Sequence, residues 1–339
     1  MTSALVLSGG IAVADVPKVA VDIAPVHSLV SKVMNGLGSP TLIIPAEASP
    51  HEYQLRPSEA KALQEAKLVF WIGEDLSPWL EKGLSTLAKG ASVTTLLEVD
   101  GIELLAFREG ALFEEHDHDD HDDHDKKKKD DHDDHDHDDH DGHDKKKKKD
   151  DHDDHDDHDG HDDHEGHAHG EHDPHAWLSP GIAKVWLNVI AAKLSEVDSD
   201  NAGTYFSNAN SAKQELDALS EEIIKMLDPI RGEKFIVFHD AYQYFEKHFN
   251  ISASGAISLG DASDPSPARL MEIQKRIANE SVHCVLAEPQ YNEGLVKAVV
   301  AGTDANTAVI DPLGVGIEVG PSLYNNLIRN LATNLSNCF

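Results

Sequence analysis

The sequence is poor in basic side chains. It has 29 lysines and arginines against 62 aspartates and glutamates, which gives a formal net charge of −33 at pH 7. The segment between His116 and His172 holds 24 aspartates, 2 glutamates and 9 lysines and so carries −17 of this charge, which leaves the rest of the chain acidic as well. Without a basic stripe to displace counterions from phosphates, we expect no nucleic-acid partner. An acidic protein of this kind suits the binding of cations.

Long apolar runs are also scarce. Ala4 to Val13 is an apolar stretch of the length found in export signals, and Ala12-Val13-Ala14 supplies the small residues of a cleavage site before Asp15. The basic residues that usually precede such a stretch are missing. We interpret residues 1–14 as a signal peptide and expect an exported, periplasmic protein, since no other segment approaches the length of a membrane span. The alternative is a first buried strand, which two glycines in its middle disfavour.

Cysteine occurs twice, as Cys284 and Cys338. In an oxidising compartment such as the periplasm, an even pair favours a disulfide over a metal site. A bridge across this loop would stabilise the fold by roughly 4 kcal/mol, less any strain. Two unrelated thiols are the alternative.

Histidine, by contrast, is concentrated in one tract. No apolar residue stands between His116 and Gly166, so the tract cannot bury a core, and we expect residues 116–172 to form a disordered loop. Flexible imidazoles and carboxylates bind zinc at several weak sites. The candidate low-affinity ligands are His116, His118, His121, His124, His132, His135, His137, His140, His143, His152, His155, His158, His161, His164, His167, His169 and His172. A loop that only adds charge and solubility is the alternative.

The remaining sequence alternates short apolar strands with helical patterns. Strands are expected at residues 18–22, 41–45, 67–71 and 92–99, and again at 234–238, 251–259, 282–288 and 307–311. Because these are continuous apolar runs, they suit parallel sheets covered on both faces. A helical pattern from Asn201 to Leu227 separates the two groups and would span about 40 Å. The sequence therefore predicts an α/β fold of two lobes, each with a mostly parallel sheet flanked by helices, joined by one long helix.

The domain boundaries follow from this pattern. The N-terminal lobe is expected to comprise residues 15–115 and 173–200, interrupted by the tract at 116–172. The linking helix would occupy residues 201–229 and the C-terminal lobe residues 230–339.

Polar residues stand where several of these strands end. His51 follows the strand at 41–45 by a short loop, His239 ends the strand at 234–238, and Glu288 and Asp311 end two later strands. Ligands of open parallel sheets bind beyond the carboxyl ends of the strands. His175 joins this group because the tract stops just before it, in "DPHAWLSP", where prolines and apolar residues anchor the chain. Three imidazoles favour zinc over manganese or calcium, and Asp311 or water would complete a tetrahedron.

Each of these residues also has a plainer interpretation. A single histidine at a strand end is commonly a hydrogen-bonded cleft residue. Glu288 could cap the helix that follows it. Asp311, which precedes Pro312 and Gly314, could simply open a turn.

Several long motifs in one order resemble a known family. "ASPHEYQLRPSEAKALQEAKLVFWIGEDL", "DPHAWLSP", "KFIVFHDAYQYFEKHF", "VLAEPQ" and "DPLG" are similar to the ZnuA-type zinc receptors among bacterial solute-binding proteins, over about Val19 to Cys338. The resemblance implies two α/β lobes joined by one long helix, with Zn²⁺ held in the cleft between them and delivered to the membrane permease of an ABC importer. It also implies a disulfide between Cys284 and Cys338. We expect a transport receptor that is not an enzyme, and a monomer.

The resemblance implies individual ligands as well. The family's three histidines correspond to His51 in "PHEY", His175 in "PHAW" and His239 in "FHDAY", and its carboxylate ligand near the C-terminus corresponds to Asp311. Manganese-binding relatives have a carboxylate where His239 stands, so zinc is implied here. Pro50 stands where zinc receptors of enteric type have a glutamate, which leaves Asp311 or water as the fourth ligand.

Two other functions stay open. A periplasmic zinc hydrolase also uses three histidines and a water, although the sequence has no H-E-x-x-H motif. In a zinc store or chaperone, the tract would be the main site and the lobes its scaffold.

Overall fold

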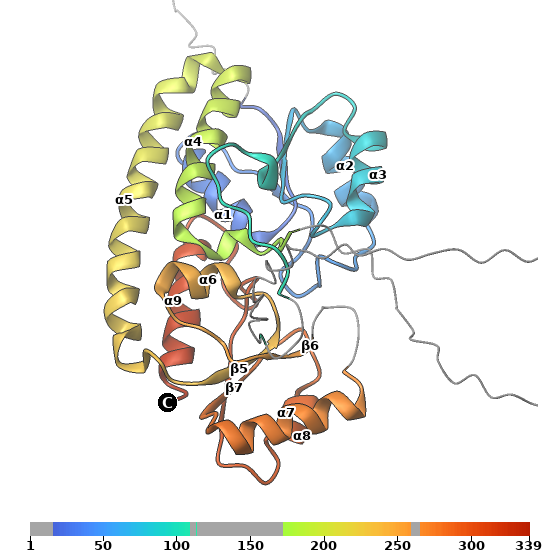
Figure 1. Ribbon diagram of the computed structural model, residues 1–339. Helices are drawn as coiled ribbons and strands as arrows, with labels where there is room; N and C mark the ends of the chain where they lie inside the picture. Colours follow the sequence, from blue (N-terminus) through green and yellow to red (C-terminus); the bar gives the residue numbers. More distant parts are fainter. Residues whose placement is uncertain (1–15, 109–112, 114–171, 259–264) are drawn as a thin grey trace, which may run out of the picture. The chain divides into compact units, whose positions relative to one another are not determined.

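The computed structural model describes residues 16–108, 113, 172–258 and 265–339 (Figure 1). The predicted signal peptide and all of the histidine tract except His172 lie outside these residues, so their roles stay predictions. Among the helices described, none is both long and apolar enough to cross a membrane.

The first lobe is built on a parallel sheet of order β2-β1-β3-β4. Its strands are β1 (Val19–Val21), β2 (Thr41–Leu42), β3 (Leu68–Trp71) and β4 (Ser92–Thr95). Its helices are α1 (Ala24–Val33), α2 (Pro57–Glu65), α3 (Pro78–Leu87) and, after the tract, α4 (Pro180–Val197). Each of these helices has a proline in its first turn, where the missing amide proton costs no hydrogen bond.

The second lobe repeats this plan with a parallel sheet of order β6-β5-β7-β8. Its strands are β5 (Phe235–His239), β6 (Ala256–Ser258), β7 (Cys284–Ala287) and β8 (Asn306–Val309). Its helices are α6 (Gln243–Phe249), α7 (Pro267–Glu280), α8 (Glu293–Val300) and α9 (Leu323–Ser336). The two parallel sheets confirm the predicted α/β fold.

The long helix α5 (Ala202–Leu227) joins the two groups of strands, as predicted. Its 26 residues correspond to about 39 Å. A buried stripe recurs every three or four residues along it, formed by Tyr205, Ala209, Ala212, Leu216, Leu219, Ile223 and Leu227. This stripe packs on α4, α1 and α9, and Figure 1 shows α4 running alongside α5. The helix therefore contacts elements of both lobes.

The edge strands β4 and β8 differ from the prediction of fully apolar, fully covered strands, whereas the edge strand β6 is buried. The inner strands β1, β3, β5 and β7 are buried along their whole length, but β4 and β8 are largely exposed or half-buried. The strand predicted at 92–99 ends at Thr95, and a 3₁₀ turn (Leu96–Glu98) follows. An edge strand has a neighbour on one side only, so its outer residues need not be apolar.

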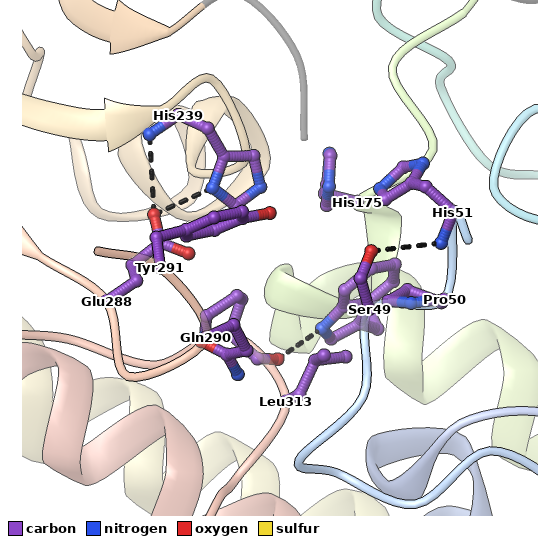
Figure 2. Close-up of a pocket in the computed structure, with 11 residues that line it drawn as sticks. Ser49, Pro50, His51, His175, His239, Glu288, Gln290, Tyr291 and Leu313 are labelled. Atoms are coloured by element: carbon purple, nitrogen blue, oxygen red, sulfur yellow. Dashed lines mark hydrogen bonds and ion pairs between the residues drawn. The ribbon is translucent and has the colours of Figure 1, made fainter. Parts of the chain in front are cut away.

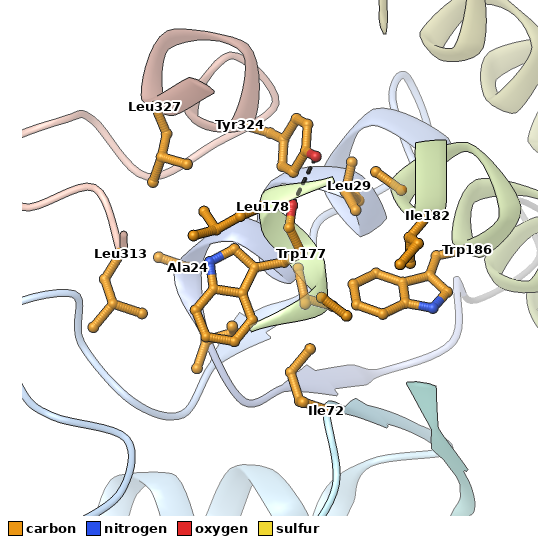
Figure 3. Packing of buried hydrophobic residues seen from close by; sticks show 14 of the residues in the cluster. Ala24, Leu29, Ile72, Trp177, Leu178, Ile182, Trp186, Leu313, Tyr324 and Leu327 are labelled. Carbon is orange, nitrogen blue, oxygen red and sulfur yellow. Dashed lines mark hydrogen bonds between the residues drawn. The ribbon is translucent and has the colours of Figure 1, made fainter. Parts of the chain in front are cut away.

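The largest hydrophobic core contains residues of both lobes and surrounds Trp177 (Figure 3). The indole Nε1 of Trp177 donates to the carbonyl of Pro312 (2.8 Å), and the hydroxyl of Tyr324 in α9 donates to the carbonyl of Trp177 (2.8 Å). The backbone of Tyr324 donates in turn to Ser28 Oγ in α1 (3.0 Å). Residues near the C-terminus thus fix the segment that carries His175.

The predicted disulfide is present. Cys284, the first residue of β7, is bonded to Cys338, which follows α9, with a Cα–Cα distance of 5.7 Å. The bridge uses both cysteines of the chain and ties the last helix to an inner strand of the second lobe.

Candidate metal site

A small pocket lies where loops of the two lobes meet (Figure 2). Its cavity volume is about 10 Å³, close to that of one water-sized sphere. The lining residues are Ser49, Pro50, His51, His175, Trp177, His239, Glu288, Gln290, Tyr291, Pro312 and Leu313. The three histidines that the sequence singled out are all among them.

His239 is the last residue of β5, and its side chain is almost completely buried. Its Nδ1 lies 2.7 Å from Glu288 Oε1. Because an ionised carboxylate only accepts hydrogen bonds, Nδ1 carries the proton and Nε2 keeps its lone pair. Tyr291 packs edge-on against the imidazole, with ring centroids 5.5 Å apart. These two contacts therefore hold the ring in one orientation, with Nδ1 turned toward Glu288.

His175 is held in the same way by the residue two positions before it. Asp173 Oδ1 accepts hydrogen bonds from the Nδ1 (2.8 Å) and from the backbone amide (2.9 Å) of His175. Both side chains are buried, and the 3₁₀ turn that starts after His175 places Trp177 against the ring, with centroids 5.1 Å apart. The Nε2 atom of His175 is therefore also left with its lone pair.

His51 lies in the loop between β2 and α2 and is half-buried. The loop is fixed through the carbonyl of Pro50, which accepts hydrogen bonds from Ser77 Oγ (2.9 Å) and from Trp79 Nε1 (2.8 Å). Both donors stand at the start of α3. The backbone amide of His51 itself donates to Ser49 Oγ at 3.3 Å.

His175 lies between the other two imidazoles. Its ring centroid is 5.6 Å from that of His51 and 5.3 Å from that of His239. Rings bound through nitrogen at about 2 Å to one tetrahedral zinc ion have centroids about 5 Å apart. Within the described part of the chain, no group of three or more histidine, cysteine, aspartate or glutamate side chains already stands in a metal-holding arrangement. A zinc ion bound by all three rings would therefore require a change in their present arrangement.

Comparison with known proteins identifies the family of this chain. The family model described as zinc-uptake complex component A, periplasmic (ZnuA), matches residues 19–338. The chain belongs to the ZnuA family.

Named relatives of the ZnuA family cover almost the whole chain. It is 47% identical over 320 residues to the high-affinity zinc uptake system protein ZnuA of Brucella abortus (strain 2308), covering 94% of this chain and 91% of that protein. It is 44% identical over 326 residues to the protein of the same name from Paracoccus denitrificans (strain Pd 1222), covering 96% and 92%. A crystal structure of ZnuA has the same fold, with a TM-score of 0.70 at 21% identity, covering 96% of this chain and 99% of that one.

Asp311, the expected carboxylate ligand, does not line this pocket. Its Oδ1 accepts from Gln290 Nε2 (2.8 Å) and from the amide of Leu313 (2.9 Å), and its Oδ2 accepts from the amide of Val315. The two bonds from backbone amides of the turn match the plainer interpretation of "DPLG". Its role as a ZnuA-type ligand remains a prediction.

The sequence pattern missed the roles of two carboxylates. In "DPHAW", nothing in the sequence pattern links Asp173 to the orientation of His175, and Glu288, which by its position could cap a helix or bind the metal, lies against His239. Burial beside Glu288 and Asp311 also raises the pKa of Tyr242 well above its usual value, so this phenol stays neutral. The side chain that an imidazole contacts is set by the tertiary structure, so the spacing of residues along the sequence does not predict it.

The tract contributes one described residue. His172 forms an isolated antiparallel bridge with Ala106, and the amide of Asp173 donates to the carbonyl of Leu105 (2.8 Å). The last residue of the tract is therefore paired with residues 105–106 of the first lobe, where the chain resumes its fold.

Proposed function

We propose that this protein captures Zn²⁺ in the periplasm, in the cleft between its two lobes, and delivers it to the membrane permease of an ABC importer. The observation that carries the proposal is the convergence of His51, His175 and His239 on one small pocket, with buried carboxylates on two of the imidazoles. The name shared by its relatives, high-affinity zinc uptake system protein, supports the same function. The protein acts as a receptor rather than an enzyme, and as a monomer.

In this proposal the three imidazoles bind zinc through nitrogen, and Asp311 or a water takes the fourth position. Neutral nitrogen ligands suit zinc better than manganese or calcium. For Asp311 to bind, its carboxylate would have to leave the amides of Leu313 and Val315, whereas a water needs no such change. A cavity of about 10 Å³ suits an ion, and it is far smaller than the several hundred Å³ typical of pockets for organic ligands. The size of the pocket thus disfavours a hydrolase.

The signal peptide at residues 1–14 and the tract at residues 116–172 complete the proposal. The signal peptide exports the chain, and the tract binds additional zinc weakly through its histidines.

Zinc titration by calorimetry and by competition with a chelator tests the proposal. Four proteins are compared: the full chain, a deletion of residues 116–168, His239→Ala, and His283→Ala as a control. The deletion spares His172 and its bridge to Ala106. His283 is an exposed histidine paired with Glu233 at 2.8 Å, and it does not line the pocket. We expect the deletion to keep one tight site and lose weak ones, His239→Ala to lose the tight site, and His283→Ala to match the full chain.

Two results would favour the other functions. Loss of the tight site in the tract deletion, with His239→Ala unchanged, would indicate a zinc store. Hydrolysis of ester, phosphate or peptide substrates by the zinc-loaded protein, abolished by His175→Ala, would indicate a hydrolase.

A further inference from the structure

A network of hydrogen bonds joins the segments that carry His175 and His239. Residues 102–108 of the first lobe run along α6, the helix that begins four residues after His239. The amide of Leu105 donates to the hydroxyl of Tyr244 (3.0 Å), and this hydroxyl donates to the carbonyl of Asp173 (3.0 Å). Gln243 Nε2 donates to the carbonyl of Ala106 (3.1 Å) and to Asp173 Oδ2 (3.3 Å). Helix α6 thus reaches the carboxylate that orients His175.

Arg108 closes this network with an ionic cluster. Its Nε lies 2.9 and 3.0 Å from the two carboxylate oxygens of Asp240, which directly follows His239, and its Nη2 also donates to Asp240. Its Nη1 and Nη2 donate to Glu246 Oε2 (2.8 Å) and Oε1 (3.0 Å). The ring of Phe113 stacks on the guanidinium, with 3.6 Å between Cζ and the ring centroid. One side chain of the first lobe therefore holds two carboxylates of the second.

The cluster is buried, so its charges matter. The side chains of Asp240 and Glu246 are 4% and 5% exposed, and that of Arg108 is 18% exposed. Burial by itself would lower the pKa of Arg108, but the attraction of Glu246 and the hydrogen bonds to Asp240 outweigh it and raise the pKa, so the guanidinium stays charged. Without Arg108, two buried carboxylates would face each other with no positive charge between them. Removing one partner of a buried ion pair is costly for this reason.

We infer that Arg108 is a positioning residue of the metal site: by binding Asp240 and Glu246, it holds His239 at a fixed distance from His175 across the two lobes. This rests on the proposed zinc site. The pair of imidazoles 5.3 Å apart is then preformed before zinc arrives, while His51 completes the site from its own loop. Because a preformed pair is already ordered, zinc binding does not include the unfavourable free energy of ordering it, as it would in a looser site.

Lys247 provides a matched control. It stands on the same helix and binds the same segment, because its Nζ lies 2.7 Å from Glu103, but both side chains are largely exposed. Exposed pairs contribute little. If any link between α6 and residues 102–108 sufficed, Lys247→Met and Arg108→Met would behave alike.

The test compares Arg108→Met, Arg108→Lys, Lys247→Met and the triple variant Arg108→Met, Asp240→Asn, Glu246→Gln. Three quantities are measured: zinc affinity by chelator competition, the melting temperature of the metal-free protein, and the visible absorption of bound Co²⁺, which reports ligand geometry. We expect Arg108→Met to weaken zinc binding roughly 10- to 100-fold, as the loss of outer-shell partners does. Arg108→Lys should recover part of this loss, and Lys247→Met should match the unmodified protein.

The triple variant separates positioning from mere stabilisation. It removes the buried charges together with Arg108, so the melting temperature should recover while zinc affinity stays weak and the Co²⁺ spectrum stays altered. Unchanged zinc affinity and Co²⁺ spectrum in Arg108→Met, or full recovery of zinc affinity in the triple variant, would overturn the inference. His239→Ala measured alongside keeps the two proposals apart. If His239→Ala binds zinc as the unmodified protein does, the proposed site itself is wrong; if only Arg108→Met does, the role of Arg108 alone is wrong.

Discussion

The two lobes have the same strand order but use a buried carboxylate at the centre of each sheet differently. The order β2-β1-β3-β4 in the first lobe corresponds to β6-β5-β7-β8 in the second. In the first lobe, Asp22 directly follows β1, and its carboxylate accepts from the backbone amides of Ile23 (2.7 Å) and of Ile72 beyond β3 (2.6 Å). In the second lobe, Glu288 directly follows β7, and it accepts from His239 at the end of β5 (2.7 Å). A carboxylate therefore bridges the same two inner strands in both lobes.

The difference lies in what each carboxylate binds. Open parallel sheets bind ligands where the strand order reverses, which here is between β1 and β3 and between β5 and β7. Asp22 fills that position with backbone amides, so the first lobe brings its histidine, His51, from a neighbouring loop. Glu288 instead holds an imidazole and leaves its second nitrogen facing the pocket. Topology provides the position, and the bonded partner decides whether that position can bind a metal.

Replacing His239 with alanine should have the largest effect on zinc binding. The substitution removes a nitrogen ligand and leaves Glu288 without the imidazole that it binds. We expect zinc affinity to fall by more than the roughly 100-fold that marks the upper range for outer-shell losses. Chelator competition measures this affinity. An affinity within a few-fold of that of the unmodified protein would show that the second lobe supplies no ligand to the zinc site through His239.

Replacing Glu288 with glutamine tests the carboxylate itself. The side chain keeps its size but loses its charge, so it supports the Nδ1 proton of His239 less well and makes Nε2 a weaker ligand. We expect zinc affinity to fall roughly 10- to 100-fold. If instead Glu288→Gln binds zinc normally while His239→Ala does not, the orienting role assigned to Glu288 is refuted.

Replacing Asp22 with asparagine is the matching test in the first lobe. We expect the zinc affinity to stay within about threefold of that of the unmodified protein, because the carboxylate of Asp22 binds backbone amides and no proposed ligand. Its effect should appear in stability. Burial raises the pKa of Asp22 from 3.8 to about 7, against the lowering effect of the amides of Ile72 and Ile23. Between these two pH values the folded state holds a proton that the unfolded state has lost, so the free energy of unfolding falls as pH rises through this range.

Urea unfolding of the metal-free protein over that pH range measures the effect. The contribution of Asp22 should amount to roughly 4 kcal/mol, and Asp22→Asn should remove it, leaving a flatter pH profile. A variant with the same pH profile as the unmodified protein would show that Asp22 titrates normally.

The sequence predicted the architecture well because that part depends on local patterns. Continuous apolar runs identify β1, β3, β5 and β7, whose residues are all buried, and the uninterrupted pattern before Asp228 identifies α5. The edge strand β4 was predicted too long because Leu96 and Leu97 are buried without being part of a strand. Apolar sequence reports burial, and it does not by itself distinguish a strand from the turn that follows it.

The site was predictable to the extent that it depends on strand ends. His51, His175 and His239 line one pocket as their positions after strands and beside the tract suggested, while their role as ligands is still to be tested. The contacts that orient them were not predictable. Asp240 and Arg108 are 132 positions apart in the chain, and their pairing depends on how α6 packs on a segment of the other lobe. Composition and periodicity do not indicate which side chains pair when they are so far apart in the sequence.

Removing the disulfide should have the smallest effect on zinc binding, although it is a covalent bond of the lobe that carries His239. Cys284 begins β7 and Cys338 follows α9, so the bridge lies at the opposite end of β7 from Glu288. Replacing both cysteines with alanine should lower the free energy of unfolding by about 4 kcal/mol, because the unfolded chain is no longer constrained across 54 residues. Zinc affinity should stay the same, since the hydrogen bond between Glu288 and His239 is made at the carboxyl ends of the strands.

Urea unfolding and chelator competition on the same samples check both quantities. A matching loss in zinc affinity would mean that the two ends of the second sheet are coupled, and that the lobe must be intact along its whole length to hold the imidazole in place.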